Sequence, residues 1–327
     1  MIQPKYSICI TNMNMEATIE TALTSVLNQL DDRFEMIVVD ESTDRSRQIL
    51  LQMQKKYPNL RTVLLEPNRK RTIAEARNVS VQESNGEYCL LHIDCDDIWE
   101  PFISEFVKVF HRLEALIPQE ILLVGQQLNM GKRDFLLSHG PYRNGATGED
   151  RDMWMRLAKT GAFFPMNHVP FFHRMPLPKK TQKTKALVRN YYSIRDGIRS
   201  GSSLKSFLLA LVGNPGKLTY VTRSYNLFIY PLAFLNAKIL GSVDTSDYFE
   251  NIDDWNSYKI EHGGTFLEIA RRYDPTVSID FLTDEGKWLF SNKRYDKVFS
   301  DMENELQLSL PPISKTKSSN PDGNIQI

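Results

Sequence analysis

The amino-acid sequence predicts an α/β protein with a mostly parallel sheet, helices on both faces of that sheet, and a mainly helical C-terminal region. Three observations support this fold class. Strand-like and helix-like segments alternate along residues 6–125, the strand-like segments are apolar almost throughout, and acidic residues follow two of them. Parallel strands covered on both faces read as continuous apolar runs, and an alternating β-α order places a helix between successive strands.

The first segments show this alternation most clearly. Tyr6–Thr11 is a short apolar run that predicts the first strand. Between Glu16 and Leu30, apolar residues recur at intervals of three, one, three, one and three, which predicts an amphipathic helix with one buried stripe. The pattern then continues with a strand over Phe34–Asp40, a helix over Ser46–Tyr57, a strand over Arg61–Leu65, a helix over Thr72–Ser84, a strand over Glu87–Ile93, a helix over Pro101–Ile117 and a strand over Ile121–Gly125. Proline at the first helical position is favoured, so the helix after the last acidic residues is expected to begin at Pro101.

The pattern changes after residue 176, and four parts are expected. Residues 1–176 form the sheet domain, and residues 177–242 form helices rich in basic and aromatic side chains. Residues 243–310 read as a small helical extension with acidic and aromatic residues. Residues 311–327 are dominated by Ser, Lys, Asn, Pro and Gly, which predicts a disordered tail.

Composition limits the class of protein. Lys plus Arg and Asp plus Glu each number 40, and this balance argues against a general nucleic-acid binder. Three cysteines without zinc-ligand spacing suit a reducing compartment. The N-terminus lacks a signal segment, and no apolar run approaches the roughly 20 residues that span a bilayer. We therefore expect a cytoplasmic protein that can still attach to the inner face of the cell membrane.

Acidic residues follow two of the predicted strands. Asp94, Asp96 and Asp97 occupy three of four consecutive positions after the strand Glu87–Ile93, and Asp40 ends an earlier strand. Such close carboxylates repel one another, so a compensating cation is expected, and hard oxygen ligands favour Mg²⁺ or Mn²⁺. In an extended chain Asp94 and Asp96 would face one side and Asp97 the other. Because ligands of parallel sheets bind beyond the carboxyl ends of the strands, these acids are expected to meet in one crevice. A solvated acidic loop is the alternative.

Six sequence pieces, in order, resemble glycosyltransferase family two. They are Ile8–Asn14, Ser25–Gln29, Phe34–Asp44, the Ala-Arg-Asn of residues 76–78 with the Asn-Gly-Glu-Tyr of residues 85–88, His92–Asp97, and Gly148–Leu157. The resemblance covers roughly residues 6–175 and does not extend to the C-terminal half. It implies the GT-A fold, which is Rossmann-like, and an inverting enzyme that uses a nucleotide-diphosphate sugar, with UDP-sugars favoured.

The resemblance also implies roles in binding the donor. Asp96 and Asp97 would hold the metal, and Asp94 would contact the ribose. The other residues expected to contact the nucleotide are Thr11, Asp40, Arg71 and Arg77. For Asp40 the alternative is an Asx-type turn with the residues that follow it. The pair His173 and Arg174 is expected near the diphosphate, with a simple loop position as its alternative.

The chemical step requires a base. Glu149 and Asp150 open a predicted helix, and the resemblance implies that Asp150 deprotonates the acceptor hydroxyl beside Glu149. Acidic residues in a first helical turn also favour the helix dipole, and Asp152 is assigned that role.

The acceptor is expected to bind near the basic and aromatic helices of residues 177–242. Helices of this composition can lie in a membrane interface, which would suit a glycan or lipid-linked acceptor of the cell surface. Packing beneath the sheet domain, or an oligomer contact, is the alternative. Two other functions compete: a non-catalytic subunit that binds nucleotide sugars, and a sugar nucleotidyltransferase. The latter usually has a glycine-rich phosphate loop, whereas Thr11–Glu16 contains no glycine.

Overall fold

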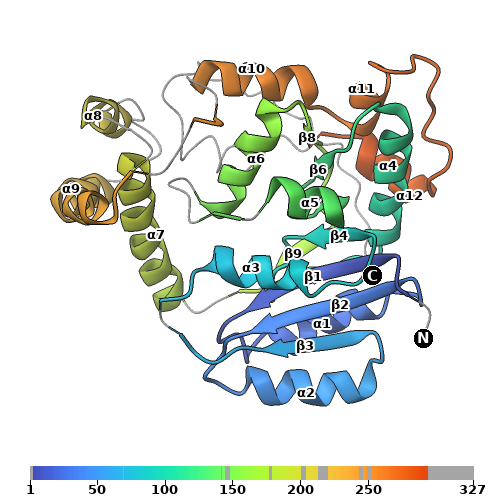
Figure 1. Cartoon of the computed structure of the whole chain (residues 1–327), viewed down its shortest axis with the longest axis horizontal. Coiled ribbons are helices and arrows are strands. Elements are labelled where there is room, and N and C mark those ends of the chain that lie inside the picture. The colour runs from blue at the N-terminus through green and yellow to red at the C-terminus, as the bar shows by residue number, and fades with distance from the viewer. Residues whose placement is uncertain are drawn as a thin grey trace, which may run out of the picture.

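The computed structural model describes residues 3–68, 70–140, 142–143, 148–176, 179–199, 204–212, 220–242, 246–248 and 252–293. A seven-stranded sheet with the order β3-β2-β1-β4-β7-β6-β8 lies at its centre, with helices packed against it (Figure 1). The strands are β1 Tyr6–Asn12, β2 Phe34–Asp40, β3 Leu60–Leu64, β4 Tyr88–Leu91, β6 Leu122–Val124, β7 Asn129–Lys132 and β8 Phe163–Pro165. All of them run in one direction except β7. The predicted α/β class with a mostly parallel sheet is confirmed.

Helices and a second small sheet complete the architecture. The helices are α1 Ile19–Leu27, α2 Ser46–Lys56, α3 Ile73–Gln82, α4 Ile103–Leu116, α5 Arg133–His139, α6 Glu149–Lys159, α7 Lys179–Arg199, α8 Leu204–Val212, α9 Tyr220–Leu240, α10 Ile252–His262, α11 Phe266–Ala270 and α12 Asp284–Ser291. The second sheet pairs β5 Asp97–Trp99 with β9 Phe172–Arg174 in antiparallel orientation.

The two faces of the sheet have separate apolar cores. Ile8 and Ile10 of β1 pack on one face with α1 and α4, whereas Cys9 packs on the other with α5 and α6. Successive strand residues point to opposite faces, so an uninterrupted apolar run fills both cores. This explains why the predicted strands lack polar alternation.

Element boundaries differ from the predictions in a few places. The first helix begins at Ile19 rather than Glu16, and α4 begins at Ile103. Pro101 therefore precedes the helix instead of occupying its first position, and this prediction was wrong. The short strands β5, β7, β8 and β9 have three or four residues each and were not predicted. Each contains a polar residue, glycine or proline, unlike the equally short apolar strand β6.

The C-terminal helices α10 to α12 pack on the sheet domain. Phe266 and Phe290 are fully buried in the core that also contains Phe106 of α4. On the other face, the Tyr258 hydroxyl donates a hydrogen bond to the Phe163 carbonyl of β8 (2.9 Å). Residues 252–293 therefore complete the core, although the sequence suggested a separate extension. The predicted tail, residues 311–327, lies outside the described residues.

Helices α7, α8 and α9 form a layer at one edge of the molecule (Figure 1). The Tyr225 hydroxyl of α9 donates to the Leu187 carbonyl of α7 (3.1 Å), and the Asn236 amide donates to the Tyr191 hydroxyl (2.8 Å). Among the helices that the structure describes, none combines the length and apolar character needed to cross a bilayer.

A buried histidine makes stability depend on pH. His168 is fully buried; its Nε2 accepts a hydrogen bond from the Gln126 N–H (2.8 Å), and Nδ1 therefore donates to the Val169 carbonyl (2.8 Å). This arrangement holds a neutral ring, and burial lowers the pKa of His168 to about 4. In the unfolded chain the pKa is about 6.5, so between about pH 6.5 and 4 only the unfolded state takes up a proton.

We therefore expect acid to weaken the fold through His168. The contribution of the neutral His168 to the free energy of unfolding is complete above about pH 6.5. It falls by at most about 3 kcal/mol as the pH decreases toward 4. Urea unfolding at several pH values checks this. A His168→Gln variant should be less stable at neutral pH but should lose less stability on acidification. An equal acid dependence in both proteins would refute the assignment.

Candidate functional site

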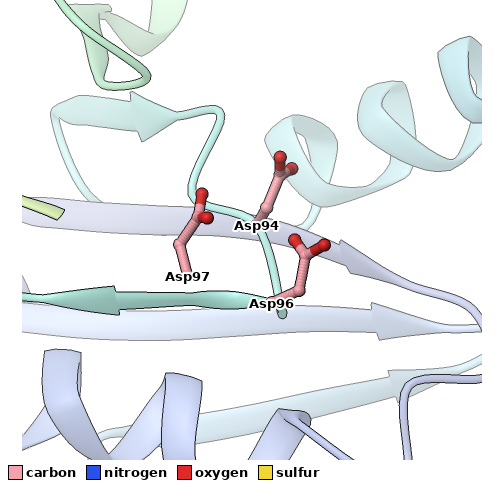
Figure 2. Close-up of side chains that lie close together, drawn as sticks. All are labelled: Asp94, Asp96 and Asp97. Atoms are coloured by element: carbon pink, nitrogen blue, oxygen red, sulfur yellow. The ribbon is translucent and has the colours of Figure 1, made fainter. Parts of the chain in front are cut away.

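Three carboxylates converge at a turn beyond the carboxyl end of β4. The strand ends at Leu91, His92 adopts a left-handed backbone conformation (φ 72°), and a turn brings the Asp97 N–H to the Asp94 carbonyl (3.4 Å). One carboxylate oxygen each of Asp94, Asp96 and Asp97 lies within 4.8 Å of the others, and the three side chains point to the same side of the turn (Figure 2). We name these residues the acidic turn. The predicted opposite orientation of Asp97 was wrong because the chain turns here instead of running extended.

An arginine from a distant segment offsets part of the negative charge of the acidic turn. The pairing of β5 with β9 sets Arg174 opposite Asp97, and its Nε and Nη2 bond the two Asp97 carboxylate oxygens at 3.0 and 3.2 Å. Nη2 also lies 3.0 Å from Asp94 Oδ2, which accepts a further bond from Gln127 Nε2 (2.7 Å). Burial raises the pKa of both Asp94 and Asp97, and Arg174 opposes this rise. A set of carboxylate oxygens this compact fits a hard divalent cation such as Mg²⁺ or Mn²⁺.

A second group of polar residues surrounds Asp150. Helix α6 begins with Glu149 and Asp150 directly after Gly148, whose φ of 92° suits glycine. The Nη1 atom of Arg77 contacts Asp150 Oδ1 and lies 3.1 Å from Glu149 Oε1. His92 Nε2 lies 3.1 Å from Asp150 Oδ1. Burial and the charge of Arg77 lower the pKa of His92 well below its ordinary value, so a neutral imidazole and a guanidinium both border the carboxylate.

Tyr142 completes this group, and the Ala-Arg-Asn motif explains its position. The Asn78 side chain donates to the Tyr142 carbonyl (2.8 Å) and accepts from its N–H (2.7 Å). The Tyr142 hydroxyl lies 3.2 Å from His92 Nε2, and the His92 ring stacks on Trp154 of α6. Arg77, His92, Tyr142, Glu149 and Asp150 are named the base cluster. Within this motif, Arg77 thus gives the cluster a positive charge, and the next residue, Asn78, fixes the backbone of Tyr142 by two hydrogen bonds.

One small cavity is lined by Asp94 of the acidic turn and by three residues of the base cluster. Its lining includes Thr11, Asp94, Arg77, His92 and Tyr142, and its volume is about 10 Å³. That is about the volume that one water needs. The predicted residues Thr11, Arg77 and Asp94 therefore line one cavity at the carboxyl ends of β1 and β4, and Asp150 contacts Arg77.

Asp40 and Arg71 lie one strand further along the sheet. The fully buried Asp40 carboxylate accepts bonds from the Asn12 amide and the Ser42 hydroxyl, both 2.6 Å, and lies 3.4 Å from Arg47 Nε. A weak bond from the Ser42 N–H (3.4 Å) makes the Asx-type turn that was the alternative for this residue. Arg71 pairs with Glu41 at 3.0 Å. Contacts of Asp40 and Arg71 with a nucleotide stay predictions.

The predicted diphosphate pair is split by the structure. His173 is exposed, and its Nε2 lies 2.6 Å from Glu100 Oε1, away from the carboxylates that Arg174 binds. Neighbouring strand residues point in opposite directions, so both cannot face the acidic turn. A contact of His173 with the diphosphate stays a prediction.

Asp152 is a buried anchor. Its carboxylate is fully buried, lies 3.0 Å from Arg143 Nη2 and 2.9 Å from Arg156 Nε, and accepts a hydrogen bond from the Tyr248 hydroxyl. It therefore ties α6 to two other segments, which goes beyond the predicted interaction with the helix dipole.

Sequence reasoning missed three residues of the site. His92, Gln127 and Tyr142 contact predicted site residues, yet none belongs to a recognised acid or base pair. His92 and Gln127 both have positive φ, a strained conformation that gathers at functional sites but leaves no mark in the sequence of a non-glycine residue. Tyr142 is placed by a long-range clamp that only the fold reveals.

Part of the chain is similar to known proteins. Residues 7–164 match the family model described as glycosyl transferase family 2. An uncharacterised glycosyltransferase of Nostoc is 32% identical over 114 residues, 34% of each protein. The putative teichuronic acid biosynthesis glycosyltransferase TuaG of Bacillus subtilis is 36% identical over 99 residues, 30% of this chain and 38% of TuaG. The matched stretches thus span little more than a third of these relatives. The solved structure of Staphylococcus aureus TarS, residues 1–349, with UDP-GlcNAc is 16% identical, covers 84% of each chain and has a TM-score of 0.47.

Proposed function

Because the chain belongs to glycosyltransferase family 2 through residues 7–164, we propose that it is an inverting transferase that moves a sugar from a nucleotide-diphosphate sugar to an acceptor hydroxyl. A UDP-sugar is the proposed donor. The observation that carries this proposal is that the acidic turn and the base carboxylate lie close together. Asp94 of the turn lines one cavity with Arg77, and the Arg77 guanidinium contacts Asp150.

The donor is proposed to bind along the carboxyl ends of β1, β2 and β4. Thr11 and Arg77 contact the nucleotide, Asp94 contacts the ribose, and Asp96 and Asp97 hold Mg²⁺ or Mn²⁺. When bound, such an ion supplies positive charge that stabilises the leaving diphosphate. Arg174 already bonds Asp94 and Asp97, so an ion at these carboxylates either shares their oxygens with the guanidinium or makes it release them. Once released, Arg174 is well suited to the diphosphate, because guanidinium groups bind phosphate oxygens by paired hydrogen bonds.

Asp150 is proposed to act on the acceptor. Its carboxylate takes the proton from the acceptor hydroxyl while the acceptor oxygen bonds to the anomeric carbon and the bond to the diphosphate oxygen breaks. One displacement of this kind inverts the anomeric configuration. Arg77 orients the carboxylate, and the neutral His92 lies beside it. Glu149 shares Arg77, so the guanidinium keeps a partner when Asp150 receives the proton.

We further propose that the acceptor is a glycan or lipid-linked intermediate of the cell envelope, reached by peripheral contact with a membrane. The name of TuaG, which refers to teichuronic acid biosynthesis, supports an envelope polymer. The basic and aromatic helices α7 to α9 support a membrane surface as the place of reaction.

A thermal-shift screen tests the proposed donor site. UDP, GDP and their sugar derivatives are added with and without Mn²⁺, and a preferred donor should raise the melting temperature most when Mn²⁺ is present. A hundredfold excess over Kd stabilises the folded state by about 2.7 kcal/mol. An Asp96→Asn variant should lose the part of the melting-temperature rise that depends on Mn²⁺. The control variant Asp32→Asn, which changes an exposed acid elsewhere, should keep it. The absence of any nucleotide shift at every Mn²⁺ concentration would refute the donor site.

A further inference from the structure

Helix α9 presents an apolar face to solvent. Among the described side chains of this helix, the buried ones are Ile229, Ala233 and Ala237, four residues apart. The opposite side, named the α9 outer face, contains the exposed residues Leu227, Phe228, Pro231, Leu232, Phe234, Leu235 and Ile239. Phe228 is 76% exposed and Ile239 is 85% exposed. A helix on the surface of a soluble domain normally turns polar residues outward, so this helix has the reverse arrangement.

The α9 outer face lies within a strongly basic part of the chain. Residues 179–240 contain eleven Lys and Arg residues and a single acid, Asp196, a net charge of +10. Because the whole chain is neutral, the remaining residues carry −10. Lys238 lies on the outer face itself, and Lys205 of α8 is exposed beside the apolar residues Leu204 and Leu208. The apolar surface is therefore accompanied by positive charge, which suits an anionic partner.

We propose that the α9 outer face docks on the surface of a bilayer that contains anionic lipid, with the helix lying in the interface and not crossing it. Large apolar side chains that protrude from a convex helix, accompanied by basic residues, are typical of interfacial helices. A symmetric dimer through the same face would bring two basic regions of like charge together, which disfavours a second copy as the occupant. None of the described helices meets the requirement for a membrane span.

The position of α9 gives this docking a purpose. Figure 1 shows α8 and α9 at the outer edge, with α7 between α9 and the sheet domain. Helix α7 begins at Lys179, a few residues after Arg174, which bonds Asp94 of the acidic turn. Docking thus holds the candidate site close to the bilayer, where a lipid-linked acceptor lies. Only this purpose depends on the proposed function, whereas the docking does not.

Vesicle flotation with the full chain tests the proposal. Vesicles of phosphatidylcholine mixed with phosphatidylglycerol are compared with vesicles of phosphatidylcholine alone. The wild-type protein is expected to float with the anionic vesicles at least about tenfold more strongly, and added salt should weaken this binding. A triple variant, Phe228→Ser with Leu235→Ser and Ile239→Ser, should lower binding by about tenfold or more. The control is Ile260→Ser, because Ile260 is 77% exposed but lies on another helix, α10. This variant should bind vesicles as the wild type does.

A charge variant separates the two contributions. The double variant Lys205→Glu with Lys238→Glu should bind anionic vesicles more weakly, and its binding should depend less on salt. The control is the double variant Lys55→Glu with Lys56→Glu on α2, which changes the net charge equally but should bind as the wild type does. Equal vesicle binding by the triple variant and the wild type would overturn the proposal. The proposal would also be overturned if light scattering showed a wild-type dimer and a monomeric triple variant, and the wild type did not bind vesicles. The nucleotide thermal shift should be the same in all these variants, so a failure of the donor site is recognised separately.

Discussion

An Asp150→Asn variant is expected to lose donor turnover by about 10³-fold, within the usual range for removal of a general base. The amide has nearly the shape of the carboxylate but accepts no proton at neutral pH. Arg77 keeps Glu149 as a partner at 3.1 Å, so the variant should fold. Because the acceptor is unidentified, the measurement is release of nucleotide diphosphate from the donor, with water as the acceptor.

Two controls make this result specific. The variant should show the same nucleotide-dependent melting shift as the wild type, since donor binding does not need the base. A Glu149→Gln variant removes the neighbouring carboxylate, which also contacts Arg77, and should retain more turnover than Asp150→Asn. Wild-type turnover in Asp150→Asn would remove this residue from the mechanism.

Replacing Asp152 by Ala is expected to destabilise the protein by about 3–5 kcal/mol, the usual effect of removing one partner from a buried ion pair. The substitution leaves Arg143, Arg156 and the Tyr248 hydroxyl without the fully buried carboxylate that all three now contact. Urea unfolding at pH 7 measures the change.

The matched control is Asp134→Ala. Asp134 pairs with Arg133 at 3.5 Å, but its side chain is 95% exposed, so its removal should change stability by less than about 0.5 kcal/mol. Asp150 and Asp152 lie two positions apart on one helix, yet the first should affect turnover and the second stability. Wild-type stability of Asp152→Ala would refute its role as an anchor.

The fold was largely predictable from local patterns. The apolar run Phe34–Asp40 coincides with β2, and the Ser46–Tyr57 pattern differs from α2 by one residue. Such segments succeed because burial leaves a local pattern, which is a continuous apolar run in a strand covered on both faces and a helical period in a helix. The short strands β5 and β9 were not predicted because both contain charged or polar residues, unlike the equally short apolar strand β6. This pair delivers Arg174 to the acidic turn.

The sequence by itself determined the order of the elements and the presence of acids at strand ends, because periodicity and the direction of parallel strands are local properties. Only the tertiary structure decided which acids meet. It turned Asp97 toward Asp94, buried Asp40, and joined Arg77 to Asp150 across 73 positions of the chain. It also decided that the apolar side of α9 faces outward. These outcomes depend on contacts between segments that are distant in the sequence. The free energies of such contacts cannot be read from any stretch of neighbouring residues.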